Sequence, residues 1–141
     1  MLTLEKEFKF EAAHRLAKGY TGKCASIHGH SWVGVIEVTR PGDQLDEFDM
    51  LVDFGDIKKA IAETVDALDH SCLVYEEDDL LSYLIVHGQK YYALKGNPTS
   101  ETLARHLFNV FTEKLKQFGG QVISVTIKET CTSSCKITTN Y

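Results

Sequence analysis

The chain has 141 residues, of which 43% are hydrophobic and 25% charged, and its formal net charge is −5. This length and composition predict one globular domain spanning residues 1–141 and exclude a disordered or low-complexity protein. The acidic balance, without a cluster of lysine and arginine, argues against a partner with a phosphate backbone, so we expect no nucleic-acid binding.

No apolar stretch approaches the roughly 20 residues that a membrane helix needs, so we also expect no membrane partner. The first residues, MLTLEKEFKF, carry charges where a signal peptide would be apolar. We therefore expect a cytoplasmic protein, in which the cysteines are reduced thiols.

Two strands are predicted near the N-terminus. Residues 3–14 alternate between apolar and charged positions, which is typical of a half-buried strand. After a loop rich in glycine, lysine and serine, residues 28–40 alternate again, and Trp32 shares its parity with His28 and His30. Two strands separated by one loop indicate a long hairpin.

Two helices and two further strands follow. An apolar stripe from Ile57 to Leu68 predicts the first helix, and the second begins after Thr99, a plausible N-cap, and ends at Gly119-Gly120. Residues 121–129 alternate and predict a strand, and residues 136–139 predict a short last one. Residues 74–95 fit no single pattern. The order β-β-α-α-β-β predicts an α+β fold, with helices on one face of an antiparallel sheet.

Three histidines are the strongest functional signal. Residues i and i+2 of a strand point to the same face, so His28 and His30 share one. His14 ends the preceding strand, next to the start of the following one in an antiparallel hairpin. Three converging imidazoles with an open fourth position are the usual composition of a catalytic zinc site.

Cys24 lies four residues before His28, in the loop that passes this site. It could be a fourth ligand that closes a structural zinc site. It could also be a thiol activated by nearby positive charge for proton transfer. Spacing alone does not separate these two roles.

Two acidic positions also stand out. Asp69-His70 follows the first helix, and such a pair is either structural or a carboxylate that orients an imidazole. Glu129 continues the row of Ile123, Val125 and Ile127, and a carboxylate there needs a partner because burying an unpaired charge is costly. An arginine, or a ligand with two adjacent N–H donors, would satisfy it.

These pieces resemble the 6-pyruvoyltetrahydropterin synthase superfamily, and within it the 6-carboxytetrahydropterin synthase branch of the queuosine pathway. Six matching stretches follow the family's order over nearly the whole chain: FKFEAAHRL, CASIHGHSW, LVDFGDIKK, LDHSCL, NPTSETLA and KETCTSSC. The sequence departs from the family in its longer segment between LDHSCL and NPTSE, where Val74 replaces the usual Asn.

The resemblance implies a tunnelling fold with a four-stranded antiparallel sheet and two outer helices per subunit. It further implies trimers that close a barrel, two of which form a homohexamer with sites at subunit interfaces. The matched residues would be the Zn²⁺ ligands His14, His28 and His30, the catalytic residues Cys24, Asp69 and His70, and the pterin anchor Glu129.

The implied reaction converts 7,8-dihydroneopterin triphosphate, a pterin triphosphate substrate, into 6-carboxytetrahydropterin, acetaldehyde and triphosphate. The nearest alternative is a 6-pyruvoyltetrahydropterin synthase, which acts on the same substrate. An alternative of another class is a non-catalytic pterin- or metal-binding protein whose zinc is closed off by Cys24. Arg15, Lys18 and Lys23 are nearby cations for the triphosphate.

Overall fold

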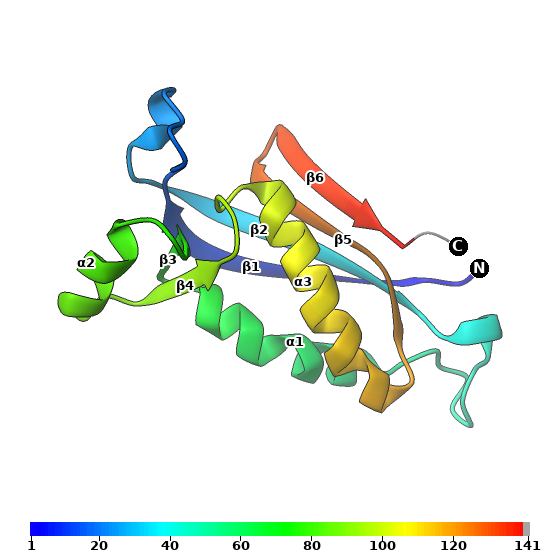
Figure 1. The fold of residues 1–141 in the computed structure, drawn as a ribbon. Helices are drawn as coiled ribbons and strands as arrows, with labels where there is room; N and C mark the ends of the chain where they lie inside the picture. The colour runs from blue at the N-terminus through cyan, green and yellow to red at the C-terminus, as the bar shows by residue number, and fades with distance from the viewer. Residues whose placement is uncertain (140–141) are drawn as a thin grey trace.

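A long antiparallel hairpin forms the centre of the structure. In the computed structural model, which describes residues 1–139, β1 (Leu4–His14) pairs with β2 (His28–Thr39) (Figure 1). Its register places His14 opposite His28. The alternation of the sequence predicts both strands to within one residue at each end.

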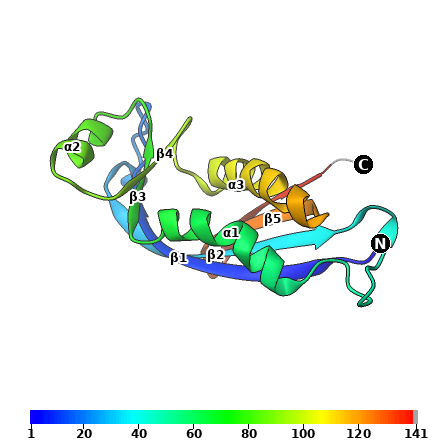
Figure 2. The ribbon, with the colours of Figure 1, turned by 90° about the horizontal axis from the view of Figure 1, so that it is seen from below.

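Two helices, α1 (Phe54–Leu68) and α3 (Ser100–Leu115), cover one face of the sheet (Figure 2). The side chain of Asp53 caps α1 by accepting the N–H of Gly55, and that of Thr99 caps α3 by accepting the N–H of Thr102. The predicted N-cap at Thr99 is therefore confirmed. Gly119, with a φ of +72°, ends the helical stretch that continues α3, a conformation that favours glycine.

The main core lies between this sheet face and the two helices. The rings of Phe10 and Trp32 stack with their centroids 5.9 Å apart. Apolar residues from every layer complete this core, among them Phe8, Ile36, Ile57, Leu68, Leu103, Leu107, Phe111, Val125 and Ile127. Because the buried residues of β1 and β2 share the parity of the three histidines, packing the core also fixes the face on which those histidines lie.

The predicted sheet is wrong in strand number and direction. Within residues 1–139 the structure has six strands in the order β4-β3-β1-β2-β5-β6, and three α-helices. The additional elements are β3 (Ser71–Tyr75), α2 (Leu80–Val86) and β4 (Tyr91–Leu94). β3 pairs parallel with β1 and β4 parallel with β3, so the sheet is mixed rather than antiparallel. Strands of five and four residues are too short to show a reliable period.

The C-terminal hairpin completes the other side of the sheet. β5 (Gln121–Thr130) pairs antiparallel with β2, and β6 (Ser133–Thr138) pairs antiparallel with β5. The last strand begins three residues earlier than residue 136, where the sequence predicts its start. Among residues 1–139, no helix has the length and apolar character needed to cross a membrane.

The segment around α2 is joined to the end of β1 by an ion pair. The guanidinium of Arg15 donates to both carboxylate oxygens of the buried Asp78, at 3.0 and 2.5 Å. Asp78 also accepts the N–H of Leu80 in the first turn of α2. The Arg15 guanidinium holds the pKa of Asp78 below its usual value. This interaction occupies Arg15, one of the cations considered for the triphosphate.

We expect Asp78→Asn to lower the free energy of unfolding at neutral pH by about 1–3 kcal/mol, less than for a fully buried pair because Arg15 is partly exposed. Since the pKa of Asp78 is depressed in the folded protein, the stabilisation is present above the unfolded pKa. It is lost as the pH falls through the folded pKa. Urea unfolding at about pH 7 and about pH 3 checks this, with the exposed Asp79→Asn as control. A difference from wild type that is equal at both pH values would contradict it.

Candidate metal centre

The three predicted histidines converge at one end of the central hairpin. His14 closes β1, and His28 and His30 open β2. The centroids of their rings lie 4.6 Å apart for His14 and His28, 5.0 Å for His14 and His30, and 4.9 Å for His28 and His30. The convergence predicted from strand parity is confirmed.

Backbone carbonyls orient two of the rings. Nδ1 of His14 lies 2.6 Å from the carbonyl oxygen of Pro98, and Nδ1 of His28 lies 2.7 Å from that of Ser26. A carbonyl oxygen can only accept, so each Nδ1 carries the ring proton and each neutral ring presents an unprotonated Nε2. This second hydrogen bond is typical of histidines that bind metals.

The two Nε2 atoms of His14 and His28 face each other at 3.1 Å. In the neutral rings both atoms carry lone pairs, which repel at this distance unless a cation or a proton lies between them. Burial lowers the pKa of His14, which favours the neutral, metal-binding form. The geometry of these histidines therefore fits a bound cation.

Glu129, near the end of β5, joins the histidines. Its Oε1 lies 2.9 Å from Nε2 of His30 and 3.3 Å from Nε2 of His14. Nε2 of His30 is buried and makes no hydrogen bond of acceptable geometry, in spite of the short distance to the carboxylate. One ligand atom from each of the four residues lies within 4.8 Å of the others. Three imidazoles and a carboxylate suit Zn²⁺ and several other divalent transition metals.

Trp32 forms the floor of this group. It is 1% exposed, and its ring centroid lies 5.1 Å from that of His14 and 5.3 Å from that of His30. Its indole N–H donates to the carbonyl of Ala12 at 3.1 Å, which satisfies its polar atom. The sequence places Trp32 on the histidine face by parity, but nothing in the pattern shows that it supports two imidazoles.

Cys24 does not belong to the four-residue group. It lies in a short 3₁₀ turn, Lys23–Ala25, as a free and partly exposed thiol. Its carbonyl accepts the N–H of Leu16 at 2.8 Å, which joins the turn to the chain just beyond β1. The residue that the structure places with the histidines is thus Glu129, and the role of Cys24 as a catalyst stays a prediction.

Asp69 and His70 form the expected pair. Oδ2 of Asp69 lies 3.0 Å from Nδ1 of His70, and Oδ1 accepts the N–H of Glu11 at 2.8 Å. The pKa of Asp69 is lowered, first by the bond from Glu11 and then by that from His70. His70 has a φ of +58°, which is unfavourable for a residue other than glycine. Its N–H donates to the carbonyl of Glu11 at 2.7 Å, which holds this conformation.

His70 and His30 line one cavity. This cavity has a volume of about 440 Å³, and the other residues lining it are Glu11, Ala12, Ala13, Gly29, Ser31 and Ser71. His70, the imidazole of the Asp69–His70 pair, therefore borders a space that also reaches a residue of the metal group. Its catalytic role stays a prediction.

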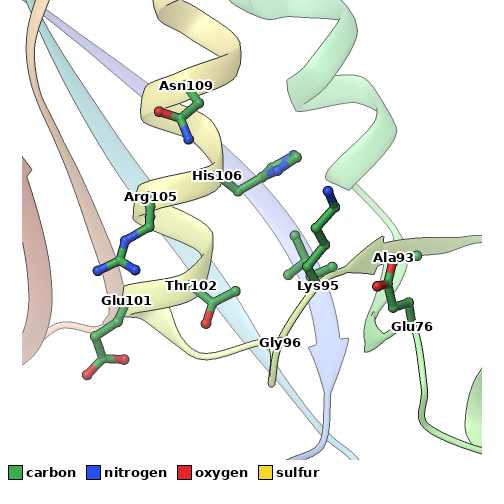
Figure 3. A pocket seen from close by; sticks show the side chains of 10 residues that line it. Glu76, Ala93, Lys95, Gly96, Glu101, Thr102, Arg105, His106 and Asn109 are labelled. Atoms are coloured by element: carbon green, nitrogen blue, oxygen red, sulfur yellow. The ribbon is translucent and has the colours of Figure 1, made fainter.

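A larger cavity, of about 530 Å³, lies between β4 and α3 (Figure 3). Its lining mixes Glu76, Lys95, Glu101 and Arg105 but includes no residue of the metal group. His106, on its wall, is hydrogen-bonded to the hydroxyl of Tyr92 at 2.6 Å. The residues that could bind a metal thus lie together at the hairpin end and not in the larger cavity.

The sequence of the chain is similar to those of known proteins. A family model described as 6-pyruvoyl tetrahydropterin synthase matches residues 3–140. The 6-carboxy-5,6,7,8-tetrahydropterin synthase of Rickettsia bellii is 39% identical over 118 residues, which cover 82% of this chain and 83% of that protein. The enzyme of the same name from Aquifex aeolicus is 31% identical over 156 residues, covering 94% and 95%.

Solved structures share the fold. An uncharacterized protein from Wolinella succinogenes superposes with a TM-score of 0.85 at 19% identity, covering 99% of this chain and 98% of the other. The 6-pyruvoyl tetrahydropterin synthase of Caenorhabditis elegans gives 0.72 at 22% identity, covering 99% and 96%. At these identities the likeness supports the fold alone.

Proposed function

The chain belongs to the 6-pyruvoyl tetrahydropterin synthase family, and from this we propose that it is a zinc-dependent 6-carboxy-5,6,7,8-tetrahydropterin synthase of queuosine biosynthesis. Its substrate is 7,8-dihydroneopterin triphosphate, and its products are 6-carboxytetrahydropterin, acetaldehyde and triphosphate. The observation that carries the proposal is the group of three imidazoles and one carboxylate at the hairpin end. The relatives that share the activity by name support the choice of reaction.

In this proposal His14, His28 and His30 hold Zn²⁺. When bound there, the metal supplies Lewis-acid polarisation of the hydroxyl oxygens on the pterin side chain. The carbonyls of Pro98 and Ser26 support this role because they keep the Nε2 atoms of His14 and His28 unprotonated and directed inward. Burial lowers the pKa of His14, which also favours the neutral ring that can bind a metal.

Two groups of the chain itself move protons. Cys24 takes or returns a proton at the side chain of the pterin, and the Asp69–His70 pair serves the second transfer. The carboxylate of Asp69 fixes the proton on Nδ1 of His70, so that Nε2 remains free to accept. The exposed side chain of His70 and its place on the cavity shared with His30 support this assignment.

Glu129 anchors the pterin. Its carboxylate, with 28% of the side chain exposed, can accept from the N3–H and the 2-amino group of the pterin at once. Such a pair of charge-assisted hydrogen bonds is strong and sets the orientation of the ring. The proximity of Glu129 to His14 and His30 brings an anchored pterin next to the metal.

Glu129→Gln tests the anchor. The amide keeps the shape of the side chain but loses its charge, so we expect weaker pterin binding by about 1.5–3 kcal/mol, or roughly 10–150-fold. Zinc content should stay at the wild-type level. Substrate KM and metal analysis check both statements, with the exposed Glu113→Gln as control. Loss of zinc with unchanged pterin affinity would make Glu129 a metal ligand instead.

The product decides between this reaction and that of a 6-pyruvoyltetrahydropterin synthase, which the name of the family model makes the second candidate. Purified protein is incubated with 7,8-dihydroneopterin triphosphate, and acetaldehyde and the pterin product are measured. Stoichiometric acetaldehyde is expected. A pterin that retains a three-carbon dicarbonyl side chain, with no acetaldehyde, would contradict the proposal.

We also propose a homohexamer, built as a dimer of trimers with sites at subunit interfaces. The strand order leaves β4 and β6 at the two edges of the sheet, and open edges favour pairing with another chain. Light scattering on the purified protein should give six times the subunit mass of 15.8 kDa. A monomer of full activity would rule out sites that need a second subunit.

A further inference from the structure

The side-chain amide of Asn97 joins two segments beside the metal centre. Its Oδ1 accepts the N–H of Ala17 at 2.8 Å, and its Nδ2 donates to the carbonyl of Ala17 at 3.2 Å. Ala17 lies three residues beyond His14 in the chain. Asn97 lies in the loop that leads from β4 into α3. The side-chain amide of Asn97 therefore bonds both backbone polar groups of Ala17, the N–H and the carbonyl.

The residue after Asn97 touches a candidate metal ligand directly. The carbonyl of the buried Pro98 accepts from Nδ1 of His14 at 2.6 Å, and His14 is 2% exposed. Proline has no N–H with which to attach itself to a neighbouring strand. The carbonyl of Asn97 is used locally by the N–H of Thr99. The side-chain amide of Asn97 thus makes the hydrogen bonds to the neighbouring segment that Pro98, which lacks an N–H, cannot donate.

The segment that contains Ala17 is also hydrogen-bonded to the turn that contains Cys24. Leu16 donates its N–H to the carbonyl of Cys24 at 2.8 Å, and Leu16 precedes Ala17. Movement of Ala17 would therefore be transmitted to both the carbonyl that orients His14 and the turn that carries the thiol.

We propose that Asn97 is a positioning residue for the metal centre, which holds the Pro98 carbonyl against Nδ1 of His14 and so directs Nε2 of His14 to the metal. This inference rests on the proposed zinc site. Asn97 acts through Pro98 and Ala17 and contacts neither metal nor substrate. Partners that orient metal-binding histidines contribute about 10–100-fold to metal affinity. Asn97 acts through such a partner and does not touch His14, so we expect the lower end of this range, about 10-fold, when Asn97 is truncated.

The test measures metal binding by the protein without substrate. Zn²⁺ dissociation constants are determined by competition with a chromophoric chelator for wild type, Asn97→Ala, Asn97→Asp and the exposed control Asn109→Ala. We expect about 10-fold weaker binding for Asn97→Ala. Asn97→Asp keeps the acceptor for Ala17 but loses the donor, so its loss should be intermediate. The d–d spectrum of bound Co²⁺ should change in both Asn97 variants and not in the control.

The outcomes separate this inference from the proposed function. If wild type binds no zinc, the proposed function fails and the inference fails with it. If wild type binds zinc and a folded Asn97→Ala binds it equally well, the inference alone is wrong. Circular dichroism establishes folding, and should Asn97→Ala not fold, an unchanged affinity and Co²⁺ spectrum in Asn97→Asp would overturn the inference in the same way.

Discussion

His28→Ala should yield a folded protein that has lost both its zinc and its activity. His28 is only partly buried, and its Nδ1 is bonded to a carbonyl two residues away in the chain. Removing its ring should therefore change the free energy of unfolding of the apo protein by no more than about 1 kcal/mol. Metal affinity should fall by more than about 100-fold, the upper end of what losing an outer partner of a ligand costs.

His28 is a better position for this experiment than His14. The ring of His14 is fully enclosed between Trp32, His30 and the carbonyl of Pro98, so truncating it would also open a cavity in the core. Zinc content after dialysis, thermal unfolding and turnover are measured for His28→Ala and for a control, His87→Ala. His87 lies at the end of α2, with its ring centroid 4.1 Å from that of Tyr83. Retention of stoichiometric zinc and activity by His28→Ala would remove His28 from the metal site.

The part of the site that lies on one hairpin could be predicted from the sequence. Strand parity fixes which side chains share a face, and an antiparallel hairpin fixes which ends meet. His14 therefore had to lie near His28, and the register with His14 directly opposite His28 bears this out. In a long strand the alternation of apolar and polar side chains repeats at every second residue, so the sequence shows which face each side chain occupies.

The partners of Glu129 could not be predicted from the sequence. Its parity predicts correctly that Glu129 lies on the same face as the apolar residues of β5. A carboxylate in that position needs a partner. The partners are the imidazoles of His14 and His30, because β5 pairs with β2. That pairing joins residues about 90 positions apart in the chain. Its register also shifts between Glu37 and Val38, which no local pattern indicates.

The segment from β3 to β4 could not be predicted for a different reason. Its strands are short, and Val74, Leu80 and Leu84 form a small hydrophobic cluster of their own. The contact that holds this segment to the end of β1 is the pair of Arg15 and Asp78. A single ion pair between distant positions leaves no periodic signal. The same pair engages Arg15, and Lys18 lies over the ring of Tyr75 at 4.6 Å.

Cys24→Ala should retain its zinc and lose turnover. The structure groups Glu129, and not Cys24, with the histidines, so the thiol is free to serve as an acid or base. Losing a positioned proton-transfer group should lower kcat by about 10²–10⁴-fold. Because no metal ligand is removed, zinc content should equal that of wild type. Cys72→Ala, which removes a half-buried thiol on β3, is the matched control.

Cys24→Ser refines the interpretation of this result. A hydroxyl fills nearly the same space as the thiol but is a much weaker acid, so a catalytic role predicts that the serine variant is almost as slow as the alanine variant. A purely structural role of the side chain, through the space that it fills, predicts that serine restores activity, because the backbone bond from Leu16 to Cys24 is kept in both variants. Loss of zinc in Cys24→Ala would instead make Cys24 a fourth ligand and favour a closed, non-catalytic metal site. Retained zinc with lost turnover excludes Cys24 as the ligand that closes the site and so contradicts that alternative.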